Sequence, residues 1–125
     1  MQTLTRVPGS FAICRFHPTE AVPEWAHGEN FSSVTRTPTE LSIVCSADEE
    51  ARGDARCEWP WRCWRVSQAH SLDETGVLAS LVSPLAAAGM SIFSISTFDT
   101  DYLFVKAEDF EAAEKVLLAA GHVIQ

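Results

Sequence analysis

Two stretches of the chain carry the alternating apolar and polar positions of β-hairpins. Residues 31–46 (FSSVTRTPTELSIVCS) and 91–107 (SIFSISTFDTDYLFVKA) each contain a β-branched or aromatic run, a short polar break and a second apolar run. The breaks, at residues 37–40 and 98–101, are rich in residues that favour turns. Two strands joined by such a break are typical of a hairpin. The pattern therefore predicts one hairpin in each half of the chain.

The two predicted hairpins resemble each other when one is shifted by 61 residues along the chain. The matched pairs are Ser33 with Ser94, Val34 with Ile95, Thr35 with Ser96, Thr39 with Thr100 and Val44 with Val105. The same shift places Glu40 on Asp101, so that an acidic residue would follow each turn. It also places Asp48 on Asp109, two candidate helix caps. The match indicates an internal repeat, although short β-rich segments also share residues by chance.

The segment Leu72–Ala88 has the periodicity of an amphipathic helix. Its apolar residues at helical spacing are Val77, Leu78, Leu81, Val82 and Leu85. Ser71 followed by Glu74 has the form of a capping box, and Gly89 suits the position just past a helix end. Pro84 removes one backbone hydrogen bond and favours a kink. The sequence therefore predicts a helix that is capped by Ser71 and ends before Gly89.

The flanking segments complete the order strand, helix, strand, strand, helix, strand in the second half of the chain. A strand is predicted over 61–68 (WRCWRVSQ), which alternates between apolar and polar positions. An amphipathic helix is predicted over 110–120 (FEAAEKVLLAA), ending before Gly121, and a short strand over 122–124.

The first half repeats this order in reduced form. Its predicted elements are a strand over 11–16, a short helix near 19–26, the first hairpin, a helix over 47–52 and a return strand near Trp59. We therefore expect an α+β fold of two tandem ferredoxin-like βαββαβ units with antiparallel sheets, the first over residues 1–60 and the second over 61–125. Units of about 60 residues bury little core, so the two should pack against each other.

Composition and charge argue against several classes of function. The chain has 125 residues, of which 46% are hydrophobic, and a formal net charge of −8. An acidic protein offers no basic face to phosphates, which argues against nucleic acid, and nothing attracts it to an anionic membrane. The chain has no run of 18 apolar residues, and its first 16 residues lack the pattern of a secretory signal. A cytoplasmic location without membrane contact is expected.

The sulfur-containing and polar residues show no spacing of an enzyme or a metal site. The four cysteines are Cys14, Cys45, Cys57 and Cys63, and no two of them form a C-x-x-C pair. We expect all four to be structural, reduced thiols, as in most cytosolic proteins. The four histidines, His122 among them, have no metal-ligand spacing and are expected in loops. Nucleotide-binding and nucleophile motifs are absent, so we expect neither catalysis nor a cofactor.

The chain also has a large aromatic content for its size. Its four tryptophans are Trp25, Trp59, Trp61 and Trp64. We interpret them as packing between the two units, with a subunit interface as the alternative. This aromatic content and the small size of each unit lead us to expect a homodimer.

Residues at the start of the predicted helix and in the second hairpin offer the groups that bind an amino acid. A helix N-terminus supplies free N–H groups for a carboxylate, and Gly76 leaves the backbone open to a ligand. Glu74 and Asp101 could hold a cationic group between them, which favours a basic amino acid. Thr97 and Phe98 would add a hydroxyl group and an apolar wall. Each residue also has a purely structural explanation, as a capping, turn, packing or strand residue.

Several motifs extend this interpretation. The segments D-E-T-G-V, P-L-A-A-A-G-M-S-I and I-S-T-F-D-T-D, together with FSSVTRTPTELSIVC and EDFEAAEKVLLAAGH, resemble the ACT domain family and, within it, the CASTOR-type tandem ACT proteins. The resemblance covers most of the chain and is weakest in residues 1–30 and 47–60. It implies βαββαβ units that bind an amino acid and regulate a partner.

Matched motif by motif, the resemblance implies a ligand site at the helix start of the second unit. Its residues would be Ser71, Glu74, Thr75, Gly76, Val77, Thr97, Phe98 and Asp101. Ser71 and Thr75 differ from the arginine-binding pattern, in which we expect glycine at the first of these positions, so the amino acid is left unnamed. We expect a non-catalytic sensor of a free amino acid. The alternative is a protein-interaction module with a vestigial site.

Overall fold

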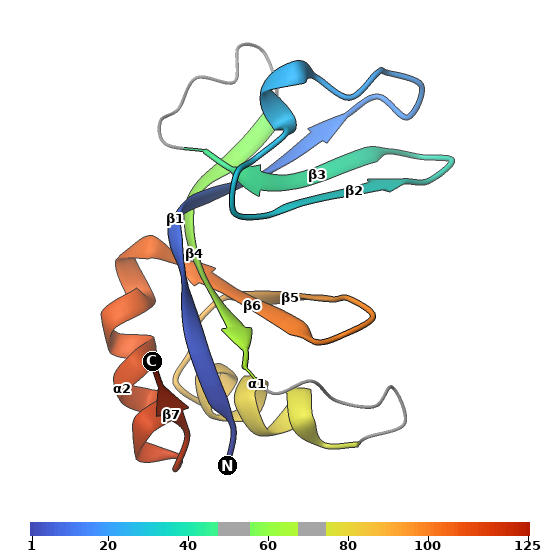
Figure 1. The fold of residues 1–125 in the computed structure, drawn as a ribbon. Helices are drawn as coiled ribbons and strands as arrows, with labels where there is room; N and C mark the ends of the chain where they lie inside the picture. Colours follow the sequence, from blue (N-terminus) through green and yellow to red (C-terminus); the bar gives the residue numbers. More distant parts are fainter. Residues whose placement is uncertain (48–55, 68–74) are drawn as a thin grey trace. The chain divides into compact units, whose positions relative to one another are not determined.

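A computed structural model describes residues 1–47, 56–67 and 75–125 of the chain (Figure 1). These residues form a mixed α/β fold with antiparallel strand pairs and two α-helices. The chain divides into two compact units. We call residues 8–61 the strand unit, and residues 1–7 with 62–125 the helical unit. The first seven residues therefore group with the C-terminal part of the chain.

Two long strands contribute to both units. They are β1 (Thr3–Phe16) and β4 (Arg56–Val66), and the division between the units falls within each of them. The prediction of two separate strands, one near Trp59 and one over 61–68, is therefore wrong, because both belong to β4. No cluster of turn residues interrupts the sequence of β4, so the extended backbone continues through it.

In the strand unit, the strands are ordered β2–β3–β1–β4. β2 (Ser32–Arg36) is antiparallel to β3 (Leu41–Ser46), which is in turn antiparallel to β1. Alternate side chains of these strands point to one face and form a core. The buried residues of this core are Ala12, Cys14, Phe16, Ala26, Leu41, Ile43 and Cys45.

The helix predicted near residues 19–26 is wrong. This segment contains one 3₁₀ turn, η1 (Glu24–Ala26), which buries Ala26 and places the Trp25 ring 6.0 Å from the Phe16 ring. Pro23 precedes the turn in an extended conformation, and the residue before a proline is disfavoured in a helix. The helix predicted over 47–52, with Asp48 as its cap, lies outside the described residues except for Ala47.

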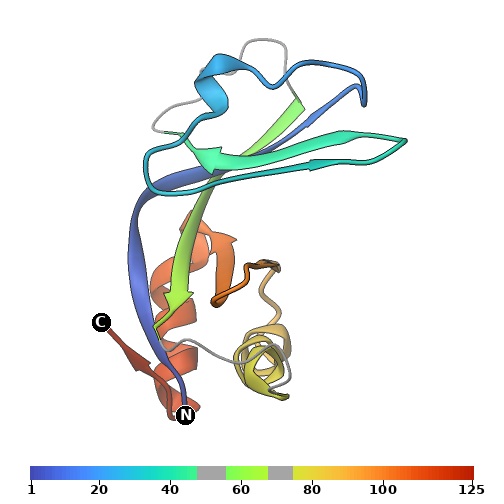
Figure 2. The ribbon, with the colours of Figure 1, turned by 45° about the vertical axis from the view of Figure 1, so that its right-hand side comes forward.

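In the helical unit, the strands are ordered β7–β1–β4–β6–β5. The further elements are α1 (Val77–Ala87), β5 (Ile92–Ser96), β6 (Asp101–Lys106), the 3₁₀ turn η2 (Ala107–Asp109), α2 (Phe110–Ala119) and β7 (Val123–Ile124). Figure 2 looks nearly along α1, which contacts α2. Both helices pack on one core, whose buried residues are Leu4, Trp64, Val66, Val77, Leu81, Leu85, Leu103, Val105, Ala113 and Leu117. The predicted second helix and final strand are confirmed.

Glycine ends both helices, as predicted. Gly89 and Gly121 have φ angles of 78° and 94°, in the left-handed region that glycine adopts without strain. After α2, the His122 N–H donates to the Leu117 carbonyl at 3.1 Å and the Gly121 N–H donates to the Leu118 carbonyl at 3.0 Å. These bonds satisfy carbonyl groups that a helix end leaves free.

The start of α1 differs from the prediction. The helix begins at Val77, and Gly76 before it has a φ angle of 80°. A left-handed residue cannot continue a right-handed helix, so Thr75 and Gly76 are not helical. The predicted capping box of Ser71 and Glu74 lies outside the described residues.

The two hairpins have the same turn, but at a shift of 60 residues and not 61. In β2–β3 the Thr37 N–H donates to the Glu40 carbonyl at 2.9 Å, and in β5–β6 the Thr97 N–H donates to the Thr100 carbonyl at 2.7 Å. The threonine hydroxyl accepts the N–H of Glu40 in one turn and of Thr100 in the other. The strand registers also agree at this shift, because Arg36 faces Leu41 in the first hairpin and Ser96 faces Asp101 in the second.

The prediction that Glu40 and Asp101 occupy equivalent positions is therefore wrong. Glu40 corresponds to Thr100, and Asp101 corresponds to Leu41. A shift of one residue moves every side chain of a strand to the opposite face, so an alignment of residue types alone did not find the true register.

Two of the cysteines form a disulfide, which corrects the expectation of four free thiols. Cys14 of β1 is bonded to Cys57 of β4, 43 residues away in the sequence. Cys45 and Cys63 form no disulfide and are buried. The spacing of the cysteines in the sequence did not suggest this pairing. It forms because β1 and β4 are adjacent strands, which brings Cys14 and Cys57 close together.

The tryptophans belong to separate cores. Trp59 packs against the core of the strand unit, and its indole N–H donates to the Ala47 carbonyl at 2.7 Å. Trp64 lies in the core of the helical unit and stacks on Phe110 at 4.7 Å between ring centroids. Each of these two rings therefore stabilises its own unit.

Candidate functional site

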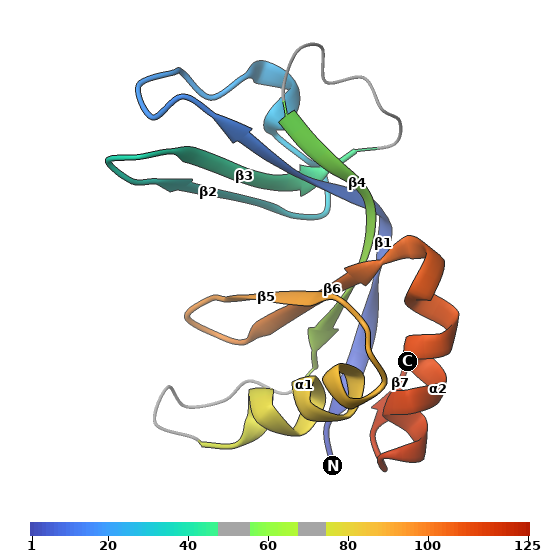
Figure 3. The ribbon, with the colours of Figure 1, turned by 180° about the vertical axis from the view of Figure 1, so that it is seen from behind.

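The predicted ligand-binding residues within the described chain all belong to the helical unit. Thr75, Gly76 and Val77 lie at the start of α1, Thr97 and Phe98 lie in the turn between β5 and β6, and Asp101 opens β6. Figures 1 and 3 show this turn and the start of α1 at the same end of the helical unit. Ser71 and Glu74 lie outside the described residues.

The start of α1 exposes backbone. Among the described residues, no atom lies within 4 Å of the position that a Cβ at Gly76 would occupy. Thr75 is exposed, whereas the Val77 side chain is 8% exposed and packs in the core, so its backbone N–H is the group that remains for a ligand. Within the part of the chain that the structure describes, no side chain caps the helix with a hydrogen bond. An uncapped helix start presents N–H groups and the positive end of the helix dipole.

The turn between β5 and β6 holds most of its polar groups in internal hydrogen bonds. The Thr97 hydroxyl donates to the Thr100 carbonyl at 3.0 Å. The Asp101 carboxylate accepts a hydrogen bond from the Ser96 hydroxyl across the hairpin. Phe98 is 83% exposed and forms no part of the core. Phe98 and Asp101 are thus side chains of this hairpin that a ligand could reach.

Thr100 is a positioning residue that sequence reasoning did not identify. Its side chain is 8% exposed, and its hydroxyl donates to the Val66 carbonyl at 2.8 Å. This bond fastens the turn to the end of β4, from which the chain runs toward α1. A threonine in a turn signals only local structure, so the sequence offered no sign of this long-range contact.

A buried histidine holds α1 in place. Because Pro84 has no N–H, the Ser80 carbonyl lacks its usual partner within the helix. The His122 Nε2–H donates to that carbonyl at 2.9 Å, and Nδ1 accepts the backbone N–H of Gln2 at 3.0 Å. Together these bonds require a neutral ring that carries its proton on Nε2. His122 lies in the loop between α2 and β7, as expected, but its side chain is buried, with 5% exposed.

A charged cluster joins β1 and β4 to α2. Arg6 binds Glu114 through two N–H groups at 2.7 and 2.9 Å, and the Trp64 indole N–H donates to the same carboxylate at 2.9 Å. Burial alone would raise the pKa of Glu114. The hydrogen bonds from Arg6 and Trp64 and the positive charges of Arg6 and Arg62 outweigh burial, so this pKa lies below its ordinary value.

The described residues gather no metal ligands, and the thiol of Cys63 is unreactive. Burial raises the pKa of the Cys63 thiol far above its ordinary range, so Cys63 carries no thiolate at neutral pH. Within residues 1–47, 56–67 and 75–125, His, Cys, Asp and Glu side chains do not gather in threes as a metal ion would require. Over the same ranges, every helix is too short or too polar to cross a membrane.

The order β4, α1, β5, β6, α2, β7 of the helical unit is that of a ferredoxin-like α+β module. A model of the ACT domain matches residues 57–119, which cover this module from β4 to α2, and a model of an N-terminal domain matches residues 9–51. The chain belongs to the ACT domain family. The resemblance found in the sequence is therefore confirmed.

Solved structures share the fold along nearly the whole chain. Protein Atu0741 from Agobacterium tumefaciens is 41% identical, with a TM-score of 0.91 over 99% of this chain and 92% of that one. The regulatory subunit of aspartate kinase from Thermus thermophilus is 12% identical, with a TM-score of 0.62 over 90% of this chain and 93% of that one. At such low identity, the second similarity shows the fold alone.

One curated relative is a named sensor. The human cytosolic arginine sensor for mTORC1 subunit 1 is 38% identical over 58 residues, which are 46% of this chain and 18% of that protein. The chain thus matches less than a fifth of the sensor's length. Of these two relatives, one is named as an arginine sensor and the other as a regulatory subunit of aspartate kinase.

Proposed function

We propose that the protein is a non-catalytic sensor that binds a free amino acid at one end of the helical unit, between the start of α1 and the β5–β6 turn. The observation that carries the proposal is the open backbone at Gly76, where a left-handed glycine precedes the helix and no atom of the described residues fills the space beside it. A side chain at Gly76 would be strained by the φ angle and would occupy the approach to the helix N–H groups.

The chemistry of this end suits the two charges of an amino acid. The N–H groups of the first turn of α1 bind the carboxylate, as helix starts bind anions elsewhere. The Asp101 carboxylate, which is only partly buried, binds the ammonium group. Phe98 supplies an apolar surface for the side chain of the ligand. Ser71, Glu74, Thr75 and Thr97 complete the proposed site, and Thr97 acts by shaping the turn.

The proposal extends to the organisation of the protein. We take the strand unit as a reduced second ACT unit, because its hairpin has the same turn and register as the hairpin of the helical unit. A cytoplasmic homodimer that regulates a partner protein is the working assembly. A disulfide is unusual in a cytosolic protein, so measuring the thiols of the protein in cells tests the proposed location.

A thermal-shift screen against the twenty amino acids tests the binding function. A ligand at 100 times its dissociation constant should stabilise the fold by about 2.7 kcal/mol, which raises the melting temperature by several degrees. Asp101→Asn should weaken binding of any ligand found. Asp99→Asn, at an exposed position of the same turn, is the matched control and should leave affinity unchanged. Equal effects of the two substitutions would argue against the site.

A protein-interaction module is the second candidate. The observation that favours it is the exposure of Phe98, since an aromatic ring 83% in water at the tip of a hairpin suits a protein contact. Absence of any amino-acid response in the screen, together with weaker capture of a partner by Phe98→Ser, would favour this candidate.

A further inference from the structure

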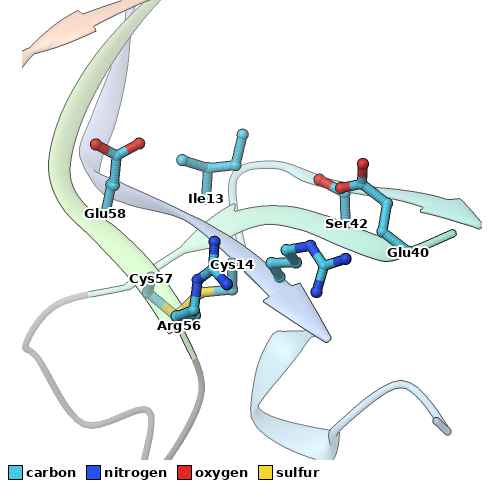
Figure 4. A pocket seen from close by; sticks show the side chains of 8 residues that line it. Ile13, Cys14, Glu40, Ser42, Arg56, Cys57 and Glu58 are labelled. Carbon is cyan, nitrogen blue, oxygen red and sulfur yellow. A yellow bond between two sulfur atoms is a disulfide. The ribbon is translucent and has the colours of Figure 1, made fainter. Parts of the chain in front are cut away.

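A pocket of about 270 Å³ opens on the strand unit (Figure 4). None of the residues that line it belongs to the proposed amino-acid site. Its side chains come from β1, from β4 and from the start of β3. They are Ile13, Arg15, Glu40, Ser42, Arg56 and Glu58, together with the disulfide of Cys14 and Cys57. Figure 4 shows Ile13, Ser42 and Glu58 rising on the same side of the sheet.

The register of the strands explains why polar groups gather here. Cys14 and its alternate neighbours on β1 point into the core, so Ile13 and Arg15 lie on the opposite face of the sheet. Arg15 faces Ser42 across the β1–β3 pair. The face opposite the core thus forms the floor of the pocket, with Ile13 as its apolar part.

The disulfide fixes the two sides of the pocket. Ile13 and Arg15 directly flank Cys14 in β1, and Arg56 and Glu58 directly flank Cys57 in β4. A covalent bond between the central residues of the two triplets holds together the backbone segments that carry the four flanking side chains. Such preorganisation reduces the entropy that binding would otherwise cost.

The charges of the pocket balance and are largely unpaired. Arg15 donates to the Thr39 carbonyl at 3.1 Å. Among the described residues, Glu40, Arg56 and Glu58 take part in no ion pair. Two guanidinium groups and two carboxylates have a formal sum of zero. A simple anion would meet the two carboxylates and a simple cation would meet the two guanidinium groups, whereas a ligand with both charges can pair with each kind.

The size of the pocket limits the ligand. Sites for drug-sized molecules occupy about 300–1,000 Å³, and this pocket lies just below that range. The geometry points to a second binding site, on the strand unit, for a small zwitterion of the amino-acid class with an uncharged side chain. This site shares no residue with the site proposed on the helical unit, so each stands or falls on its own evidence.

Titration of the full chain by NMR tests this site, with the methyl signals of Ile13 as the reporter. L-alanine, L-serine and L-glutamine are the zwitterionic probes. Acetate and methylammonium, each with a single charge, are the controls. We expect a saturable shift of the Ile13 signals with at least one amino acid and none with either control at the same concentration. Absence of a saturable shift with all three amino acids, or an equal response to acetate or methylammonium, would overturn the inference.

Substitutions separate the two sites. Arg56→Gln and Glu58→Gln should each weaken the response at Ile13 by about tenfold, because each removes a charge-assisted contact. Arg65→Gln, an exposed arginine on β4 outside the pocket, is the matched control and should have no effect. Asp101→Asn should leave the Ile13 response intact. An amino acid that shifts the Thr97 amide but not Ile13 would overturn the second site and keep the proposed function, whereas the reverse would keep the second site alone.

Discussion

The strand unit and the helical unit carry hairpins with the same turn but stabilise their sheets by different means. Among the described residues, two α-helices cover a core of ten buried residues in the helical unit, whereas a single 3₁₀ turn covers a core of seven in the strand unit. The disulfide lies in the unit with the smaller core. Small cores contribute little stability, and a covalent link between strands offsets that deficit.

Removal of the disulfide is expected to have the largest effect on stability. A small effect would contradict the comparison of the two units. Replacing Cys14 and Cys57 by alanine should lower the free energy of unfolding by about 2–4 kcal/mol, because a link across 43 residues restricts the unfolded chain. Urea unfolding measures the loss. Hydrogen exchange should accelerate in β3 and remain slow in α2.

Cys45→Ala is the control for this substitution. It removes a buried thiol from the same core without breaking a link, and should cost about 1 kcal/mol. Equal losses for the control and the double substitution would mean that the disulfide does not stabilise the strand unit.

In the helical unit, the long-range hydrogen bonds of His122 take the place of the disulfide. Their loss is expected to have the second-largest effect on stability. His122→Ala should destabilise the protein by about 2 kcal/mol, because the Ser80 carbonyl and the Gln2 N–H lose their partners. In the Pro84→Ala background the cost should be smaller, since the new backbone N–H can reach the Ser80 carbonyl within the helix. A double-mutant cycle in urea measures the difference. Additive costs would contradict the proposed link between Pro84 and His122.

Matched substitutions in the two turns sharpen the comparison. Thr37→Val and Thr97→Val each remove a hydroxyl group that accepts a backbone N–H and donates to a carbonyl in its turn. Each should cost about 1 kcal/mol in thermal unfolding. Thr35→Val, on the exposed edge strand β2, is the control and should be near neutral. A loss of stability in only one of the two variants would show that hairpins with the same register are not stabilised equally by their turns.

The smallest expected effect is a dependence of stability on pH in the helical unit. The pKa of Glu114 is lower in the folded chain than in the unfolded chain, so its ion pair with Arg6 contributes fully above the ordinary value of 4.5. That contribution is lost as the pH falls through the folded pKa. Arg6 is about half exposed, which limits the expected change to about 1 kcal/mol or less.

Two glutamine variants measure this contribution. Glu114→Gln should reduce the acid dependence of unfolding between pH 7 and pH 3. Glu111→Gln, on the same helix and exposed, should leave the acid dependence as it is. An unchanged pH profile in Glu114→Gln would contradict the depressed pKa.

Much of the helical unit could be predicted from the sequence, and less of the strand unit. The second hairpin, the helix over α2 and the glycine stops at Gly89 and Gly121 followed from local pattern, because turns, periodicity and caps depend on neighbouring residues. The 3₁₀ turn near residue 24 did not, because a helix was predicted there from the repeated order of elements, and the proline before the turn opposes a longer helix. Of the candidate site, the sequence indicated the turn and the helix start but not Thr100, whose partner lies 34 residues away.

The sequence by itself determined the two hairpins, the C-terminal ends of the two helices and the membership of the ACT family, because each rests on residues close together along the chain. Tertiary structure alone decided the register that makes the hairpins equivalent, the pairing of Cys14 with Cys57 and the burial of His122 against Ser80. These features join segments that are distant in the sequence. Their free energy comes from the specific approach of two strands or a strand and a helix, and composition and periodicity carry no record of that approach.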